Sequence, residues 1–532
     1  MEQLQNWVNA VNGFVWGPAM ITLLVGTGIY LTLRLRFLQL RYFGHAVRCI
    51  SGKYDNPDEQ GDISHFQALC AALSATIGTG NIAGVATAIS LGGPGAVFWM
   101  WVTALIGMAT KFTSCSLALK YRELHPDGSA SGGPMYFLSR GVKPSPLGKF
   151  LGVCFALFAG LASFGIGCAV QSNSVIDGLR HAFGGPAWEA TLPEGVPMLG
   201  NVAYMNLALG IALAFLVGLV IIGGIRRIAR VAEKIVPFMC VVYVFGALII
   251  LFRYYYALPA AFGQIFQYAF TPFSIGGGFA GVVVQQTVRF GVARGVFSNE
   301  SGLGSAPIAH AAAKTQEMAR EGFVAMLGPF IDTIIVCSMT ALVIISTGAW
   351  EVRSESDELI YGPGARNAVE PVSGVMIYPA DGGEAYLAEA SIRSVRHSIA
   401  DAGGQTDAYY EIPTGAALTG MAFEKGLPRF GRFIVAFGLV FFAYSTMISW
   451  SYYGDRCWEY LLGPKAVAPY RYLFCVFVVI GATISLKLVW DIADTLNAMM
   501  AIPNLIGLLV LSGVVASATK DYLKRMKESG DV

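Results

Sequence analysis

An apolar stretch at residues 70–95 constrains the fold most, because the helix-breaking run Gly78-Thr79-Gly80-Asn81 interrupts it. Glycine inside a helix costs about 1 kcal/mol relative to alanine, so two glycines beside an asparagine favour local unwinding. Backbone groups released at membrane depth are tolerated only where protein or a polar cavity satisfies them. The stretch therefore predicts a broken membrane helix, which secondary transporters use at their substrate sites. Packing of small residues against a neighbouring helix is the alternative interpretation.

The composition of the chain is typical of a membrane protein. Hydrophobic residues make up 55% of the sequence and charged residues 13%, whereas soluble domains carry about 25% charged residues. Several apolar runs exceed the roughly 20 residues that a membrane-spanning helix needs. We therefore predict an all-α polytopic membrane protein with about eleven spans. The predicted spans are 14–36, 67–91, 94–119, 149–175, 201–224, 232–252, 278–313, 323–347, 432–453, 471–488 and 491–517.

Lysine and arginine are concentrated in alternate connecting segments of this prediction. Basic side chains favour the cytoplasmic ends of membrane spans. Basic segments follow the first, third, fifth, seventh and ninth spans, and further lysines lie in the tail after residue 518. This alternation predicts that the N-terminus lies outside and the C-terminus lies in the cytoplasm.

The seventh predicted span contains a second interruption, Arg294 to Pro307, which is rich in glycine and polar residues. It lies five spans after the first interruption and runs in the opposite direction. Interruptions in corresponding helices of two oppositely oriented halves are typical of inverted-repeat transporters. We therefore predict a 5+5 inverted repeat with two interrupted helices. The predicted parts are a peripheral first span with a cytoplasmic linker (1–66), a first repeat (67–252), a second repeat (278–517) and a cytoplasmic tail (518–532).

A long segment at about 350–430 interrupts the second repeat and is predicted to be extracytoplasmic. Residues 351–411 hold more acidic than basic side chains and several Gly and Pro, and the segment contains no cysteine. Connections of this length are usually functional or disordered. The sequence leaves open whether the segment is a small lid or an excursion away from the transport domain.

Several blocks of the sequence resemble the alanine or glycine:cation symporters, and they occur in the order found in that family. The blocks are Thr76 to Gly84, Gly92 to Trp101, Gly107 to Phe112, Gly128 to Phe137, Arg294 to Pro307 and Ser445 to Gly454. The resemblance implies a leucine-transporter-like fold, a small neutral amino acid as substrate, and coupling to sodium. The chain differs from the family pattern in Ser114, where the family often carries Glu, and in the length of the 350–430 segment.

A zwitterionic substrate needs hydrogen-bond donors for its carboxylate, acceptors for its ammonium group, and space for its side chain. The unwound segment predicts Thr79, Gly80 and Asn81 on the carboxylate side, since amides at a half-helix N-terminus favour anions. For Asn81 the alternative is a hydrogen bond between helices. Gln171 lies in an uncharged polar cluster of the fourth span, which indicates either a cavity lining or a hydrogen bond between helices.

Four further aromatic or hydroxyl positions complete the predicted substrate site. Phe297 and Ser298 lie in the second interruption and either form a pocket wall or pack in the core. Thr446 and Trp450 are four residues apart and therefore share a helix face. Trp450 would cap a small pocket, or it would pack or reach the membrane interface.

The resemblance to the fold places a sodium ion between the first interrupted helix and the ninth span. By position, its ligands would be carbonyl groups near Ser74 and Ile77 and the hydroxyls of Ser445 and Thr446. Hydroxyl side chains on helices often bond to their own backbone instead.

Charged residues inside predicted spans are also candidates for function. Arg294 and Glu300 flank the second interruption, where they would either pair with each other or form a gate. Asp332 lies in the eighth span, with an interior hydrogen bond as the alternative role. Lys111 and Arg122 are expected near the cytoplasmic surface.

These observations predict a secondary active symporter that imports alanine or glycine with sodium by alternating access in a bacterial-type cell membrane. A proton-coupled or glutamine-type carrier of the same fold is the nearest alternative, and a channel or a receptor that uses the external segment is a more distant one. The expected partners are a small neutral amino acid, sodium and the lipid bilayer. We expect neither an enzyme active site, an organic cofactor nor a nucleic-acid partner, and the sequence leaves the oligomeric state open.

Overall fold

The structure is a computed structural model. It describes residues 11, 15–56, 58–126, 128–183, 204–271, 280–353, 359–361, 369–370, 376–377, 386–387, 394–401, 404–411, 414–483 and 486–530. Within these residues, eight helices are long and apolar enough to cross a membrane, or nine if one bent pair is counted as a single span. The expectation of a mostly helical polytopic protein is therefore confirmed.

The first half of the chain is helical except for one short hairpin. Its elements are α2 (Pro18–Arg34), α3 (Leu38–Arg41), α4 (Phe43–Ile50), α5 (His65–Thr76), η1 (Gly80–Gly84), α6 (Val85–Gly92), α7 (Gly95–Lys120), β1 (Glu123–Leu124), β2 (Ala130–Ser131), α8 (Pro134–Gly141), α9 (Ser145–Phe164), η2 (Gly165–Ala169), α10 (Val170–Phe183), α11 (Tyr204–Ile221), α12 (Gly224–Arg253), η4 (Tyr255–Ala257) and α13 (Leu258–Tyr268).

The second half continues with helices on both sides of a segment that contains short strands. Its elements are α14 (Ala280–Asn299), α15 (Ala306–His310), α16 (Met318–Pro329), η5 (Phe330–Cys337), α17 (Ser338–Thr347), β3 (Val352–Arg353), β4 (Leu359–Tyr361), β5 (Val369–Glu370), β6 (Met376–Ile377), β7 (Tyr386–Leu387), β8 (Ser394–Asp401), β9 (Gly404–Glu411), α18 (Gly415–Gly426), α19 (Gly431–Leu462), η6 (Pro464–Ala466), α20 (Val467–Thr483) and α21 (Leu486–Glu528).

Local sequence explains where the first broken helix begins and ends. Ser64 and Gln67 form a reciprocal capping box at the start of α5, which satisfies backbone donors that a helix terminus leaves unpaired. The helix stops at Ile77, whose backbone is extended (φ −77°, ψ 90°). The chain resumes at η1 and α6 with a bend of 54° between the two halves. The predicted interruption at Gly78 to Asn81 is therefore present.

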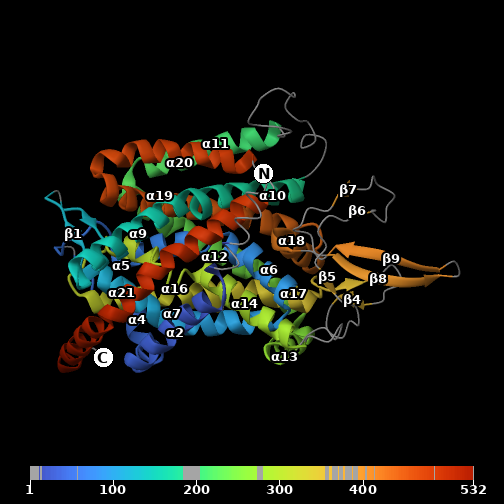
Figure 1. Cartoon of the computed structure of the whole chain (residues 1–532), viewed down its shortest axis with the longest axis horizontal. Helices are drawn as coiled ribbons and strands as arrows, with labels where there is room; N and C mark the ends of the chain where they lie inside the picture. Colours follow the sequence, from blue (N-terminus) through green and yellow to red (C-terminus); the bar gives the residue numbers. More distant parts are fainter. Residues whose placement is uncertain are drawn as a thin grey trace.

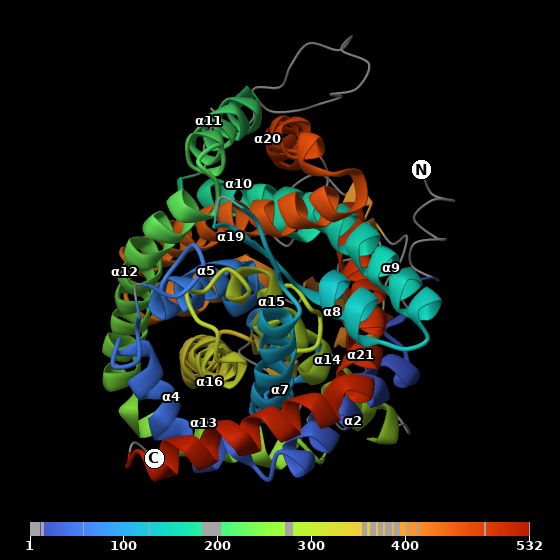
Figure 2. The same ribbon diagram turned by 90° about the vertical axis from the view of Figure 1, so that its left-hand side faces the viewer.

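The helices form an inner group and an outer ring. Figure 2 shows α5, α7, α14 and α16 in the middle, with α12, α19, α9, α21 and α2 around them. Helix α7 packs directly against α14 and α16, and α5 packs against α12 and α19. Because the inner helices are wrapped on all sides, their polar residues are removed from lipid, which is where polar groups in a membrane protein are expected.

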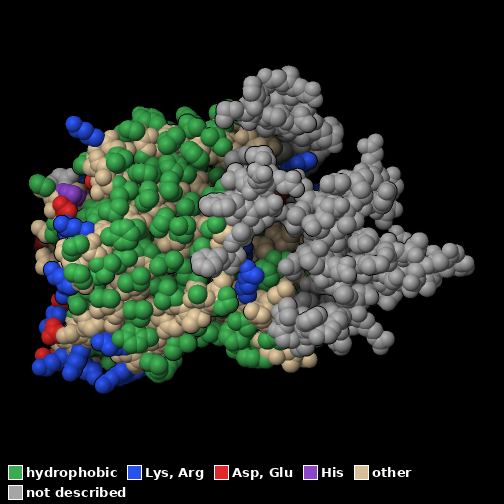
Figure 3. Space-filling view, in the orientation of Figure 1, with side chains coloured by type: hydrophobic (Ala, Val, Ile, Leu, Met, Phe, Trp, Pro, Cys, Tyr) green, Lys and Arg blue, Asp and Glu red, His purple; other side chains and the backbone are tan. Residues whose placement is uncertain are grey.

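The outer surface has an apolar belt and, at one end of the molecule, a concentration of basic side chains. Figure 3 shows the belt in green, with Lys and Arg gathered at the left-hand end. That end carries the C-terminal ends of α2 at Arg34, of α7 at Lys120, of α19 at Leu462 and of α21 (Figure 1). We call it the basic end. The opposite end, which carries strands β3 to β9 and α18, is called the insertion end.

The long segment near 350–430 is not uniform in structure. Strands β8 and β9 pair antiparallel from Ser394↔Glu411 to Asp401↔Gly404, and β5 joins β8 on the other side. After these strands, α18 packs against α17 and α19. Phe423 of α18 stacks on Tyr243, and the Thr419 hydroxyl donates to the Ile82 carbonyl at 3.0 Å. Residues 415–426 are therefore part of the helical domain.

Candidate functional site

The two interruptions meet in the middle of the molecule. A Cβ atom added to Gly80 would lie 3.2 Å from Ser298 Cα and 3.3 Å from Phe297 Cδ1. A side chain at this position would crowd both neighbours, so glycine favours the close approach. The second break follows α14, where Glu300 has a left-handed backbone (φ 53°) and Gly302 follows with φ 94°. Both predicted breaks are present, but α14 stays helical through Asn299, so the second break is shorter than the predicted Arg294 to Pro307. The fold brings the two breaks into contact.

The Asn81 side chain is held on both sides by protein groups. Its Oδ1 accepts a hydrogen bond from the Gly78 amide at 2.9 Å, and its Nδ2 donates to Asp332 Oδ1 at 2.6 Å. Asp332 Oδ2 accepts from Ser298 Oγ at 2.9 Å and from Thr333 Oγ1 at 2.7 Å. This fully buried carboxylate therefore joins the first break, the second break and η5. Hydrogen bonds to a charged acceptor are about twice as strong as neutral ones.

Three π-helical segments surround this meeting point. Asn81 lies in η1, Asp332 lies in η5, and Gln171 comes two residues after η2. A π-turn widens a helix and displaces its hydrogen-bond ladder, and such turns occur frequently at functional sites. The sequence shows no simple signal for η5, because residues 330–337 are a plain apolar run apart from Asp332 and Thr333.

Two polar atoms beside the first break have no hydrogen-bond partner among the described residues: Thr79 Oγ1 and Gln171 Oε1, both buried. Gln171 is fixed by a hydrogen bond from its Nε2 to the Ile166 carbonyl at 3.0 Å. A Cβ atom on Gly78 would lie 3.3 Å from Gln171 Oε1 and 2.6 Å from Thr446 Oγ1. A buried polar atom without a hydrogen-bond partner lowers the stability of the fold. A polar ligand that hydrogen-bonds to these two atoms would remove that cost.

Trp450, one turn after Thr446 on α19, contacts the second break. Its Nε1 donates to Glu300 Oε1 at 2.9 Å, and Glu300 Oε2 accepts from Ser305 Oγ at 2.6 Å. A Cβ atom on Gly167 would lie 2.4 Å from the Trp450 Cβ, so the indole side chain packs directly on η2. These contacts hold Glu300 in its left-handed conformation, which costs roughly 1–2 kcal/mol for a residue other than glycine.

The hydroxyl residues expected to bind sodium lie where α5 contacts α19. Ser74 Oγ donates to the Ser445 carbonyl at 2.7 Å, and Ser445 Oγ lies 3.3 Å from the Ser74 carbonyl. The hydroxyls of Ser445 and Thr446 both donate to the Phe442 carbonyl at 2.9 Å. Ile77 is fully buried at the end of α5. This cluster consists of neutral oxygen atoms, which suits a hard cation such as sodium. The Phe442 carbonyl was not predicted, because any residue type supplies it.

On the side of the insertion end, Arg294 and Phe297 lie together near the second break. Arg294 pairs with Asp494 at 3.1 Å, and its guanidinium carbon lies 5.4 Å from the centre of the Phe297 ring. A cavity of about 60 Å³ lies beside them and includes Trp16 in its wall. In the part of the chain that the structure describes, Arg294 pairs with Asp494, and Glu300 accepts from Trp450 and Ser305, so the alternative of an Arg294–Glu300 ion pair is not found there.

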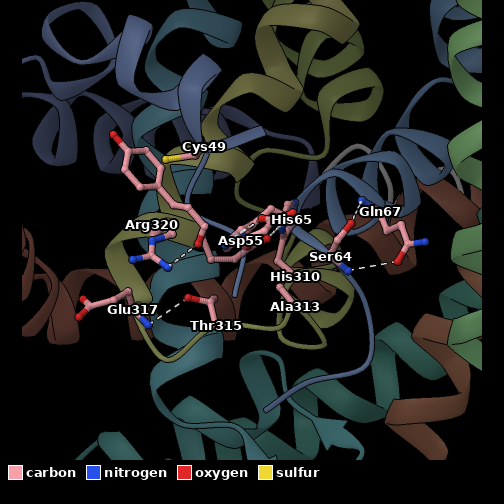
Figure 4. A network of polar contacts seen from close by, with 12 residues as sticks. Cys49, Asp55, Ser64, His65, Gln67, His310, Ala313, Thr315, Glu317 and Arg320 are labelled. Carbon is pink, nitrogen blue, oxygen red and sulfur yellow. Dashed lines mark hydrogen bonds and ion pairs between the residues drawn. The ribbon is translucent and has the colours of Figure 1, made fainter. Parts of the chain in front are cut away.

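At the basic end, Glu321 connects both broken helices. One carboxylate oxygen of this fully buried residue contacts His65 Nδ1 at the start of α5, and the other lies 2.5 Å from His310 Nδ1 at the end of α15. Figure 4 shows His65 and His310 together with Asp55 in the centre of this network. The Asp55 carboxylate lies 3.9 Å from His65 Nε2.

Arg122 also connects the segments next to the start of α5 and the end of α15. Its guanidinium donates to the carbonyls of Ala311, Ala313 and Thr315 at 2.7–2.9 Å, and to that of Gln60. These carbonyls belong to the segment after α15 and to the segment before α5. Arg122 lies just after the end of α7, at the basic end of the molecule, and its expected place near the cytoplasmic surface stays a prediction.

Lys111 was expected near the surface, and that expectation is wrong. Its side chain is 2% exposed in the middle of α7, and its Nζ has no hydrogen-bond partner among the described residues. The carboxylates of Glu300 and Asp332 interact with it electrostatically. Its sequence neighbours do not indicate the buried position, because the uncharged residues around it suit both the middle and the end of a span.

Comparisons with known proteins show which family the chain is similar to. The family model described as "Sodium:alanine symporter family" matches residues 1–369 and 399–532. The sodium/alanine symporter AgcS of Methanococcus maripaludis is 47% identical over 97% of this chain and 96% of its own length. The probable sodium/glutamine symporter GlnT of Bacillus subtilis is 32% identical over 100% of this chain and 93% of its own length.

A solved structure has the same fold at low sequence identity. The crystal structure of MhsT in complex with L-phenylalanine matches with a TM-score of 0.52 at 12% identity, over 87% of this chain and 93% of that chain. The expected leucine-transporter-like fold is thereby confirmed. The residues matched by the family model, and the full-length similarity to AgcS, show that the chain belongs to the sodium:alanine symporter family, whose members are membrane transporters and not enzymes.

Proposed function

We propose that this protein imports alanine, glycine or a similar small neutral amino acid together with sodium by alternating access. The observation that carries the proposal is the contact between the two breaks, with Thr79 Oγ1 and Gln171 Oε1 buried beside it and without partners among the described residues. Gln171 Oε1 can only accept hydrogen bonds, so it suits the substrate ammonium group. The half-helix at Gly80 and Asn81 presents its N-terminus, which suits the carboxylate.

The space at the breaks supports a small substrate side chain. Close approaches of Gly78 to Thr446 and of Gly80 to Phe297 leave little room around the unwound segment. A substrate of the size of glutamine, which the name of GlnT suggests for that relative, would require Phe297 or neighbouring side chains to move. We therefore place Thr79, Gly80, Asn81, Gln171, Phe297, Ser298 and Thr446 around the substrate and assign Trp450 to the support of Glu300.

For sodium we propose the carbonyls of Ser74 and Ile77 and the hydroxyls of Ser445 and Thr446. These residues connect α5 to α19, so an ion bound there would couple the first broken helix to the outer ring. We also propose that the repeats are residues 67–252 and 278–517, and that the basic end faces the cytoplasm. The basic side chains at that end support this orientation.

Uptake into proteoliposomes tests the proposal. Labelled alanine and glycine should accumulate against their gradients only when sodium is higher outside, and glutamine should accumulate less.

Thr446→Val should raise the half-saturating sodium concentration at least fivefold. Thr347→Val is the matched control, since Thr347 is a buried threonine that also donates to its own helix, at Val343, but belongs to α17 and not to the contact of α5 with α19. Equal accumulation with choline in place of sodium at constant pH would exclude sodium coupling. Accumulation driven by a pH gradient alone would indicate a proton-coupled carrier, and flux without accumulation would indicate a channel.

The segment before α18 should be dispensable for transport. Replacing residues 352–412 with a short Gly/Ser linker should leave sodium-dependent uptake within a few-fold of the unmodified protein, because such linkers are flexible. Extending the deletion through Gly426 should abolish uptake, since it removes the Phe423 and Thr419 contacts to Tyr243 and Ile82. If the shorter deletion inserts correctly but no longer binds alanine, the strands contribute to the substrate site.

A further inference from the structure

A groove at the basic end is lined by two segments that lie far apart in the sequence. The end of α2, the turn after it and α3 form one wall, and the last turns of α21 form the other, around a volume of about 510 Å³. Six basic side chains line it: Arg34, Arg36, Arg41, Lys520, Lys524 and Lys527. The positive-inside tendency explains basic residues at such helix ends, but it does not require two distant segments to converge on one hollow.

The positive charge of the groove is almost uncompensated by the protein. No acidic side chain lines the groove among the described residues. Of the six basic residues, only Lys524 has a carboxylate within 4.0 Å in the part of the chain that the structure describes, namely Glu528 at 3.8 Å. Arg34 donates to the Tyr30 hydroxyl, which carries no charge. Like charges held around one hollow repel each other, so the arrangement favours a bound anion.

The groove lies beside the apolar belt. Leu33, Phe37 and Leu40 come from the same wall and are 59%, 48% and 65% exposed. Residues 36 and 37 both have a left-handed backbone (φ 56° and 55°), and this corner turns the chain from α2 into α3. In Figure 3, blue side chains at the lower left directly adjoin the green belt. A ligand in the groove would therefore meet basic side chains and exposed apolar side chains together.

We propose that the groove binds the phosphate headgroup of an anionic phospholipid, whose acyl chains lie along Leu33, Phe37 and Leu40. Basic pockets between membrane helices on the cytoplasmic side bind such headgroups. A soluble phosphate compound would satisfy the same charges but would leave the apolar strip unused. Because the two walls belong to α2 and α21, the bound lipid joins the peripheral first helix to the C-terminal helix.

The test uses the purified full-length protein in detergent, with native mass spectrometry for bound lipid and thermal melting for stability. Phosphatidylglycerol should remain bound and raise the melting temperature, whereas phosphatidylcholine and glycerol 3-phosphate should not. The groove variant Lys520→Gln/Lys524→Gln/Lys527→Gln should weaken phosphatidylglycerol binding at least tenfold. Glutamine suits the exposed surface of a helix, so α21 should stay folded in this variant.

The matched control is Lys143→Gln/Lys149→Gln/Lys465→Gln, which removes the same charge from exposed positions outside the groove. It should bind phosphatidylglycerol as the unmodified protein does. Arg34→Gln/Arg41→Gln, on the opposite wall, should reproduce the loss. Equal loss in the control, or unchanged binding in both groove variants, would overturn the proposal. Stabilisation by glycerol 3-phosphate equal to that by phosphatidylglycerol would also overturn it, because the site would then bind a soluble anion.

Discussion

Glu321→Ala should cause the largest loss of thermal stability of any single substitution at the basic end. Glu321 is fully buried, and it is the common partner of His65 and His310. Removing one member of a buried charged set typically costs about 3–5 kcal/mol, because the remaining polar groups stay buried without partners. The substitution also removes the carboxylate that joins the basic-end termini of α5 and α15, which leaves Arg122 and the backbone bonds between residues 62–63 and 312–314 to hold these segments together. Thermal melting of the purified protein measures the effect.

Two further variants make this result specific. Glu321→Gln should be milder, because the amide can still accept from one histidine and donate to the other in its second tautomer. Glu317→Ala is the matched control four residues earlier. Its partner Arg525, at 2.7 Å, is half exposed, and a surface pair of this kind contributes about 0–1 kcal/mol. If Glu321→Ala melted no earlier than Glu317→Ala, Glu321 would not hold the two broken helices together.

The features that could be predicted from the sequence are those with a local physical cause. Glycines beside polar residues favour a break in a helix, so an interruption was found at Gly78 to Asn81. The second one was predicted for Arg294 to Pro307, and in the structure it begins only after Asn299. The spacing of apolar runs and the family blocks then led to the correct fold class. The hydroxyls of Ser445 and Thr446 and the amide of Gln171 were also placed near the first break, since the fold fixes which spans face it.

The partners of those residues could not be predicted, because they come from distant parts of the chain. Asn81 and Asp332 are 251 residues apart, and the two residues give no sign in the sequence that they are a pair. The role of Trp450 depends on a contact to Glu300 across 150 residues. Lys111 was misplaced since the preference of basic residues for span ends is a tendency, and a buried lysine beside two carboxylates is an exception to it.

Asn81→Asp should strongly impair the protein, and exchanging both partners should restore it. In the variant, a second carboxylate replaces the amide that donates to Asp332 at 2.6 Å. Loss of a hydrogen bond to a charged group costs about 1.5–3 kcal/mol, and two buried carboxylates repel each other. We therefore expect a lower melting temperature and at least tenfold weaker alanine binding, since about 1.4 kcal/mol corresponds to a tenfold change.

The double variant Asn81→Asp/Asp332→Asn regenerates the pair with the roles exchanged. The new amide at position 332 can donate to the new carboxylate at position 81 and still accept from Ser298 and Thr333, while that carboxylate can accept from the Gly78 amide. Because both ends of the Asn81 side chain already have protein partners, we expect the double variant to recover its melting temperature and to bind alanine within a few-fold of the unmodified protein.

Binding by scintillation proximity on monodisperse protein measures the affinity. Recovery of stability without recovery of affinity would show that the Asn81 amide itself contacts the substrate. The hydrogen bond from Asn81 to Asp332, which joins the two breaks, would then be only part of the role of Asn81.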